Sequence, residues 1–167
     1  MDVEIRGYSP VTDHPACREL WAQQAVADAD LYDDDVHEED PGAGFEEHLT
    51  KLNLSGMWVA ETKQDVIGLV GLLVDTDFAL VRPLVVDREH RDSGVGAALL
   101  ERASHEGQRR GLTHLRIDVS ARNVGGVHAA HDAGFAALSS VTLTKDLRSR
   151  RHEWRDGIDL HDRRFEY

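Results

Sequence analysis

The sequence predicts an α/β (α+β) domain whose elements follow the order β-α-α-β-β-β-α-β-α-β. Three observations lead to this fold class. Apolar or alternating runs typical of strands come in turn with segments whose apolar residues recur at helical spacing. Residues 84–111 pass from a strand through a glycine-containing turn into a helix. The 167 residues suffice for one domain with a sizeable core, in which residues 148–167 form a C-terminal tail with an added strand or hairpin.

The N-terminal third is expected to hold one strand and two helices. Residues 3–6 alternate between apolar and charged side chains, as in a short strand. Asp13 can cap the next helix, in which Pro15 suits the first turn and one face carries Ala16, Leu20, Trp21 and Ala25. Residues 28–40 are too acidic to pack and predict a loop. A second helix over residues 45–54 has on one side Phe45, His48, Leu49 and Leu52.

The later elements follow from further apolar segments. Strands are predicted over residues 57–61, 66–74 and 79–86, and the glycines of the second indicate a bulge or a close backbone approach. The central helix is expected to end at Arg109, Arg110 and Gly111. Next comes a strand with alternating Leu115, Ile117 and Val119. A helix over residues 124–133, a strand over 138–147 and a last strand or hairpin over 158–167 complete the order.

The turn before the central helix reads Arg-Asp-Ser-Gly-Val-Gly over residues 91–96. Ser93 is a good N-cap for that helix. Free backbone N–H groups and the positive end of the helix dipole converge at a helix start and favour phosphate. Gly94 and Gly96 allow the backbone to approach a ligand where a Cβ would obstruct it. The sequence therefore predicts a phosphate-binding loop here.

Two common phosphate loops do not fit these residues. A Walker loop needs Gly-Lys-Ser/Thr after its spacer, which this stretch lacks. A dinucleotide-binding loop needs a third glycine where this chain has Leu99. Asp118 falls at about the right distance for the acid that binds the ribose, but Val119 continues the strand past it. Too little chain follows residue 79 for a doubly wound domain, so a dinucleotide-binding oxidoreductase is a distant alternative.

Two motifs resemble the GNAT superfamily of N-acetyltransferases. The first, L-x-V-x-P-x-x-R followed by a glycine turn, is matched by Leu84, Val86, Arg91, Gly94 and Gly96. Arg88 replaces its usual proline and Asp92 its usual glycine, so Asp92 should contact a pyrophosphate through its backbone alone. The second, L-x-L-x-V-x-x-x-N followed by a helix and G-F, is matched by Leu115, Ile117, Val119, Asn123, Gly134 and Phe135. The resemblance runs from end to end and implies the GNAT fold, with a mixed, mostly antiparallel central sheet flanked by helices.

This resemblance implies an enzyme that moves an acetyl group from acetyl-CoA, its cosubstrate, to a primary amine of a small molecule or protein. The residues that it assigns to the coenzyme are Leu84, Val85, Val86, Arg91, Asp92, Ser93, Gly94, Val95, Gly96, Ala97 and Asn123. Main-chain groups of the strands ending at Val86 and Val119 would orient the thioester and polarise its carbonyl. The alternative is a catalytically inactive acyl-CoA-binding regulatory module.

The sequence leaves more than one candidate for the general acid and for the general base. The family often takes the acid from a tyrosine seven residues after the asparagine, where this chain has Ala130; its tyrosines are Tyr8, Tyr32 and Tyr167. On a helical wheel His131 lies about 80° from Asn123 and is the nearest substitute acid, although many histidines have no chemical role. The candidate bases are Asp118, beside the expected thioester, and Glu61, at the end of an earlier strand. Both can equally be solvated carboxylates, and a water chain could replace them.

The charge balance excludes some partners. A net charge of −12, from 19 basic and 31 acidic residues, argues against nucleic acid. Asp outnumbers Glu, and lysine occurs only at Lys51, Lys63 and Lys145, which is typical of halophilic proteins or of a GC-rich genome. The acidic segment holds Asp28, Asp30, Asp33, Asp34, Asp35, Glu38, Glu39 and Asp40 against one His37. In the family this connection commonly borders the acceptor entrance, so we expect either a cationic amine acceptor or a merely acidic surface.

The sequence contains no motif that would indicate a metal site, a disulfide bond or a membrane-spanning segment. Cys17 is the single cysteine and is expected in the core, without a disulfide or a cysteine metal site. His128 and His131, with Asp132 beside them, lack an identifiable third metal ligand. The sequence has neither a membrane-length apolar stretch nor a signal peptide, so we expect a cytoplasmic protein without a membrane partner. The sequence is also compatible with a homodimer.

Overall fold

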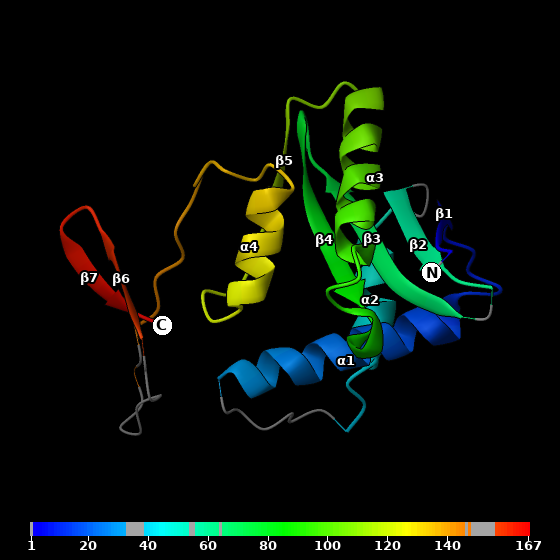
Figure 1. The fold of residues 1–167 in the computed structure, drawn as a ribbon, viewed down its shortest axis with the longest axis horizontal. Coiled ribbons are helices and arrows are strands. Elements are labelled where there is room, and N and C mark those ends of the chain that lie inside the picture. Colours follow the sequence, from blue (N-terminus) through cyan, green and yellow to red (C-terminus); the bar gives the residue numbers. More distant parts are fainter. Residues whose placement is uncertain (1, 33–38, 54–55, 64, 146, 148–155) are drawn as a thin grey trace.

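The computed structural model describes all residues except 1, 33–38, 54–55, 64, 146 and 148–155. Its centre is a five-stranded sheet in the order β1-β2-β3-β4-β5 (Figure 1). The strands are β1 (Glu4–Gly7), β2 (Met57–Glu61), β3 (Val66–Val74), β4 (Phe78–Val86) and β5 (His114–Ile117). Neighbouring strands are antiparallel except for β4 and β5, which are parallel. The expected mixed, mostly antiparallel sheet is confirmed.

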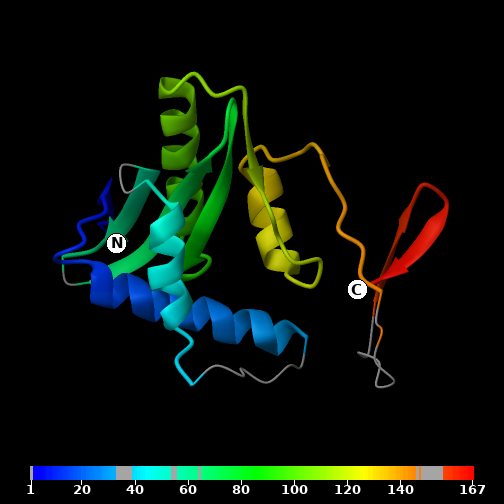
Figure 2. The ribbon, with the colours of Figure 1, turned by 180° about the vertical axis from the view of Figure 1, so that it is seen from behind.

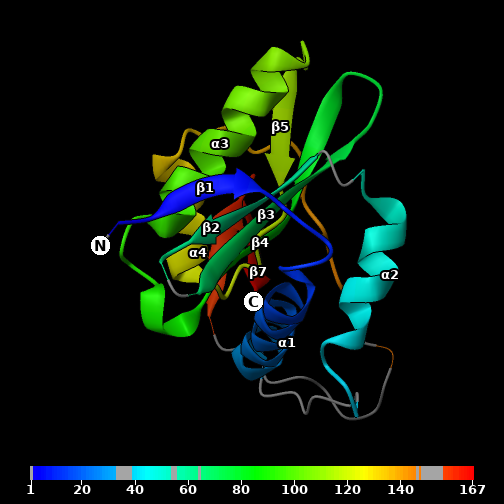
Figure 3. The same ribbon diagram turned by 90° about the vertical axis from the view of Figure 1, so that its right-hand side faces the viewer.

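Helices cover both faces of this sheet (Figure 3). Helices α1 (His14–Leu31) and α2 (Ala43–Lys51) lie on one face, where Cys17, Leu20 and Phe45 pack against Leu69 and Val85 of the sheet. Helices α3 (Val95–Arg109) and α4 (Val124–Asp132) lie on the other. The core there includes Val95, Leu99, Leu100 and Ala103 of α3. Helices α1, α2 and α3 thus bury apolar residues against the sheet, as the sequence periodicity predicts, whereas α4 buries Ala130 and exposes Val124 and Val127.

A bulge interrupts the pairing of β3 with β4. The register shifts between Val70 and Leu72. Between them, Gly71 lies so close to β4 that a Cβ would be 2.7 Å from the carbonyl oxygen of Arg82. Val81 belongs to the core under α3, whereas Val85 belongs to the core against α1 and α2. In an unbroken strand, residues four apart have side chains on the same face of the sheet. The bulge therefore reverses the faces to which the side chains after it point.

Several predicted bounds and one predicted strand are wrong. Helix α2 runs over Ala43–Lys51 rather than over 45–54. Helix α1 continues to Leu31, so Asp28 and Asp30 are helical rather than part of a loop. Strand β5 ends at Ile117, two residues before Val119, because β4 no longer runs beside it. The described part of residues 138–147 forms no strand, and Leu138, Val141 and Leu143 are exposed there. Strand propensity alone does not make a strand without a backbone partner.

The C-terminal hairpin is confirmed. Strands β6 (Gly157–Leu160) and β7 (Arg163–Glu166) pair antiparallel in a sheet of their own. His161 and Asp162 join them with φ of 49° and 59°, as a two-residue hairpin turn requires. Figures 1 and 2 show this hairpin beyond α4, away from the five-stranded sheet. Within the described residues, no helix is both long and apolar enough to cross a bilayer.

Candidate active site

The candidate site lies where β4 and β5 part. The two strands pair only from Phe78 with His114 to Val81 with Ile117. β4 then continues to Val86 on β3 alone, so beyond Val81 its other edge has no strand partner among the described residues; the place where the two strands part is called the gap below. The backbone N–H of Asp87 donates to Ile67 of β3 at 2.9 Å. Because the direction alternates along an antiparallel ladder, the backbone groups of Leu84 and Val86 point away from β3, into the gap.

The predicted phosphate loop opens onto this gap. A 3-10 turn, η2 (Arg88–His90), follows β4, and Asp92 and Gly94 then take left-handed conformations with φ of 59° and 87°. Arg91 folds back and donates from Nε to the carbonyl oxygen of Val86 at 3.3 Å. The start of α3 and the free edge of β4 are thereby held together.

The predicted N-cap at Ser93 is wrong. Gly94 occupies that position, and Ser93 donates its hydroxyl to the carbonyl oxygen of His90 instead. No side chain caps α3. The N–H groups of its first turn, from Val95 to Ala97, are therefore available to an anion.

The space around the loop glycines fits a ligand that lies against the backbone. A Cβ on Gly94 would meet nothing within 4 Å, and one on Gly96 would meet only Val86 Cγ2, at 3.6 Å. Protein packing therefore does not demand glycine at position 96. The room between the first turn of α3 and Val86 suits the pyrophosphate of coenzyme A, which glycine admits and a side chain would obstruct.

Asn123 has a local role that its motif did not reveal. It is the N-cap of α4, and its Oδ1 accepts a hydrogen bond from the backbone N–H of Gly126 at 2.8 Å. Glycine at position 126 leaves room for this cap, because a Cβ there would lie 2.6 Å from Asn123 Nδ2 and displace the side chain. Asn123 thus sets the start of α4 beyond β5, and its contact with the pantetheine arm stays a prediction.

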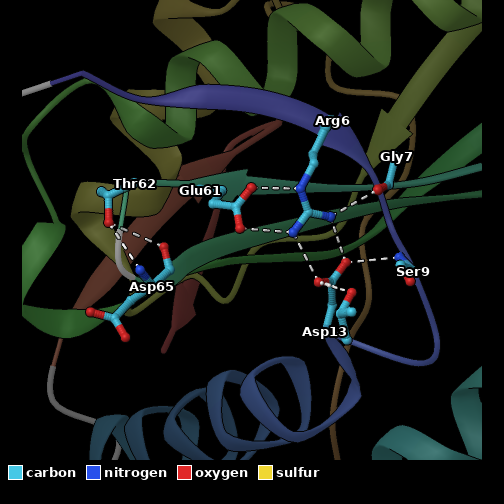
Figure 4. A network of polar contacts seen from close by, with 8 residues as sticks. Arg6, Gly7, Ser9, Asp13, Glu61, Thr62 and Asp65 are labelled. Atoms are coloured by element: carbon cyan, nitrogen blue, oxygen red, sulfur yellow. Dashed lines mark hydrogen bonds and ion pairs between the residues drawn. The ribbon is translucent and has the colours of Figure 1, made fainter.

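Glu61, one of the two candidate bases, is bound elsewhere (Figure 4). Arg6 donates from Nε to its Oε2 at 2.6 Å and from Nη2 to its Oε1 at 3.0 Å. This pairing lowers the pKa of Glu61, chiefly through the Arg6 hydrogen bonds, and so weakens it as a base. Glu61 also lies on β2, which β3 separates from β4. The geometry gives Glu61 a structural part.

The other two candidates for proton transfer are exposed. Asp118 directly follows β5, and burial alternates so that it faces away from Ile117 and Val119, as expected. The side chain of His131 is 69% exposed, with Nδ1 3.9 Å from Asp132, while neighbouring Ala130 faces the interior. The structure places Asp118 where the gap begins but leaves His131 on the outer face of α4. Their catalytic roles stay predictions.

Sequence reasoning missed the contact that closes the far side of the gap. The hydroxyl of Tyr32, at the end of α1, lies 2.7 Å from Ser120 Oγ, and Arg122 donates from Nη1 to the carbonyl oxygen of Leu31 at 2.8 Å. Tyr32 and Ser120 are 88 positions apart, so no local pattern could reveal this pair. Among the described residues, no three His, Cys, Asp or Glu side chains come together as a metal site.

Comparison with known proteins agrees with this geometry. The family described as "Acetyltransferase (GNAT) family" matches residues 15–135, well over half of the chain. Human N-acetyltransferase 8B is 29% identical over 119 residues, which are 68% of this chain and 49% of that protein. The chain thus spans about half the length of this curated relative.

Solved structures share the fold. The PaiA N-acetyltransferase of Thermoplasma acidophilum, in complex with coenzyme A, superposes with a TM-score of 0.63 and 18% identity, over 80% of this chain and 89% of that one. The ribosomal-protein-S18-alanine N-acetyltransferase of Escherichia coli gives a TM-score of 0.60 and 20% identity, over 80% and 77%. At these identities the likeness concerns the arrangement of helices and strands alone.

Proposed function

Because this chain belongs to the acetyltransferase (GNAT) family, we propose that it moves an acetyl group from acetyl-CoA to a primary amine of a small molecule or a protein. The observation that carries the proposal is the gap beside β4 with the uncapped start of α3 at its end. The family match spans every element that forms these two features. Residues 1–167 would form one such domain, with 148–167 as its tail.

The chain's own groups suit this chemistry. The N–H groups at the start of α3 would take the pyrophosphate, since a helix N-terminus favours an anion. The N–H of Leu84 or Val86 would donate to the thioester carbonyl, where negative charge develops during transfer. Acetyl-CoA supplies the activated acetyl group. The amine nitrogen forms the new bond to the acetyl carbon, the bond to sulfur breaks, the amine loses a proton and the thiolate gains one.

The acceptor that we propose is a cationic amine, such as a polyamine, an aminoglycoside or a Lys-rich protein tail. Asp28 and Asp30 are exposed on the last turns of α1, next to the gap. Of the other acidic residues of this segment, Asp33, Asp34, Asp35 and Glu38, with His37, lie outside the described residues. Asp40 is paired with Arg18, so it adds little net field. Negative charge at an entrance concentrates cations and speeds their arrival.

The test is a screen of amines and peptides by mass spectrometry for the gain of one acetyl group, with free thiol measured in parallel. Acetyl-CoA-dependent gain together with thiol release would support the proposal. Coenzyme A binding by calorimetry without thiol release for any amine would contradict it and favour the inactive acyl-CoA-binding module. None of the comparisons supports that alternative.

We also propose a cellular location and an oligomeric state for the protein. The Asp-rich, Lys-poor composition supports a salt-rich cytoplasm. A homodimer is supported by β5, the last strand of the five-stranded sheet, and by the exposed Leu138, Val141 and Leu143 that follow α4. Strand edges and apolar residues together favour pairing with a second copy. Light scattering after gel filtration would measure one chain mass if the protein is a monomer and two if it is this dimer.

A further inference from the structure

The last turn of α1 reaches the β5 side of the gap through Tyr32. Its hydroxyl lies 2.7 Å from Ser120 Oγ, three residues after the end of β5. The guanidinium of Arg122 stands over the Tyr32 ring, 4.7 Å from its centroid, and holds the carbonyl of Leu31. Ring, hydroxyl and backbone are all fixed at the point where the chain leaves β5.

Helix α1 also packs against β4, and Asp28 lies on the last part of this helix, one turn before Tyr32. This carboxylate is within electrostatic reach of Arg82 in β4 and of Arg91 in the phosphate loop. It accepts a hydrogen bond from Gln24 Nε2 at 2.6 Å. Desolvation raises the pKa of Asp28, against the lowering effects of Gln24 and the two arginines. The side chain keeps solvent exposure, so an acceptor can reach it.

Asp28 and Tyr32 are four residues apart, so they lie on one face of the helix about 6 Å apart along its axis. During acetyl transfer the amine nitrogen and the sulfur are attached to the same carbon. A base and an acid, each within about 3 Å of its atom, would therefore stand roughly one helical turn apart. Tyr32 contacts the segment that follows β5, and Asp28 lies within electrostatic reach of Arg82 in β4.

We propose that α1 supplies both proton-transfer groups of the acetyl transfer: Asp28 as the general base toward the amine and Tyr32 as the general acid toward the departing sulfur. This inference rests on the proposed function. Asp28 takes the proton that the amine loses when its nitrogen bonds to the acetyl carbon. Tyr32 gives its hydroxyl proton to the sulfur as the carbon–sulfur bond breaks, and solvent reprotonates it after the product leaves.

The neighbours of Tyr32 support this role. The hydroxyl of Ser120 can donate to the phenolate oxygen, and the positive charge of Arg122 over the ring offsets the negative charge that forms there. At the position where the family often places its tyrosine, this chain has buried Ala130. A tyrosine from α1 restores the missing hydroxyl from the opposite face of the sheet.

The experiment compares Tyr32→Phe and Asp28→Asn with two matched controls, Tyr167→Phe in the tail and Asp162→Asn, an exposed residue in the turn of the C-terminal hairpin. Acetyl transfer is measured against pH with spermidine, kanamycin and a trilysine peptide as test amines. Coenzyme A affinity is measured by calorimetry for every variant. Tyr32→Phe keeps the ring under Arg122, so it removes the hydroxyl with little change in packing.

We expect Tyr32→Phe to lower kcat by roughly 100-fold or more and to remove the alkaline limb of the kcat profile. Asp28→Asn should lower kcat similarly and remove the acidic limb. Coenzyme A affinity and the KM for acetyl-CoA should stay unchanged. Both controls should behave like the wild type.

The outcomes separate the two claims. A wild-type protein that acetylates none of the three amines would overturn the proposed cationic acceptor, and this inference with it. A wild type that transfers acetyl while Tyr32→Phe keeps its kcat and its alkaline limb would overturn the acid alone. An Asp28→Asn variant with the same pH profile as Asp162→Asn would overturn the base alone. A Tyr32→Phe defect confined to KM or to the melting temperature would show a tether rather than an acid.

Discussion

The buried carboxylate of Asp13, at the start of α1, is held by both terminal nitrogens of Arg6 in β1, at 2.7 and 2.9 Å (Figure 4). Arg6 binds Glu61 of β2 at the same time, so one guanidinium joins two strands and a helix. Asp13 is 1% exposed and also accepts from the backbone N–H of Ser9 at 2.8 Å. The Arg6 hydrogen bonds lower the pKa of Asp13 to about 2.

This pair predicts acid sensitivity. A depressed pKa in the folded state contributes stability that is present above the unfolded value, near 3.8, and is lost as pH falls toward 2. The contribution is about 2 kcal/mol at neutral pH. Asp13→Asn should therefore lower the melting temperature at pH 7 and flatten its fall between pH 4 and pH 2. Asp30→Asn is the control, and equal pH slopes in Asp13→Asn and wild type would refute the assignment.

The phosphate loop predicts the effect of Gly96→Asp. The new carboxylate would enter the space beside Val86 and repel the pyrophosphate. We expect coenzyme A affinity, measured by calorimetry, to fall tenfold or more, which is at least ~1.4 kcal/mol. Gly125→Asp adds the same charge in open space at the start of α4 and should leave affinity unchanged. A folded Gly96→Asp variant with wild-type affinity would place the pyrophosphate elsewhere.

The bulge predicts a large effect of one methyl group at Gly71. A Cβ there would meet the carbonyl oxygen of Arg82 at 2.7 Å and Pro83 Cδ at 3.0 Å. Gly71→Ala should lower the free energy of unfolding by about 1–3 kcal/mol, since β4 must move away from β3. Gly7→Ala meets nothing within 4 Å and serves as the control. If denaturant titrations give the two variants the same free energy of unfolding, β4 can move away from Gly71 without loss of stability, and the prediction is wrong.

The acidic composition predicts a response to salt. The net charge of −12 repels itself over a Debye length of about 10 Å at 0.1 M salt and about 3 Å at 1 M. If the surface is adapted to salt, the melting temperature without coenzyme A should be higher in molar KCl than in 0.1 M KCl. Identical melting curves would favour the GC-rich genome as the source of the composition.

The acceptor proposal predicts a charge effect on KM. Neutralising Asp33, Asp34 and Asp35 to Asn should raise the KM for a cationic amine, more at low salt than at high, because screening already removes the attraction at high salt. Acetyl-CoA affinity should hardly change. The control carries the same three charge changes in the C-terminal hairpin, at Asp156, Asp159 and Asp162. An unaltered KM at low ionic strength would show that the acidic segment has no role in attracting the acceptor.

Local patterns determined the elements that carry the phosphate loop. Apolar runs bounded by turn residues predicted β2 and β3 to the residue, because their burial imposes a continuous apolar sequence. The glycines of β3 predicted the bulge at Gly71. Gly94 and Gly96 predicted a turn before α3 without side chains at these two positions, since backbone conformation and close approach depend on the residue itself, whereas the cap expected from Ser93 is absent.

The sequence alone could not identify the groups that transfer protons, because the environment of each candidate is formed by residues far away in the chain. Glu61 and Asp118 are both carboxylates at a strand end, and only the tertiary structure sets Arg6 against the first and leaves the second exposed. Tyr32 meets Ser120 only because α1 runs under the sheet toward the end of β5, a contact between residues 88 positions apart. Residue type and spacing thus predicted a coenzyme site at the start of α3. The packing of α1 against the sheet decided which side chains surround the gap, since hydrogen bonds and burial act through space rather than along the chain.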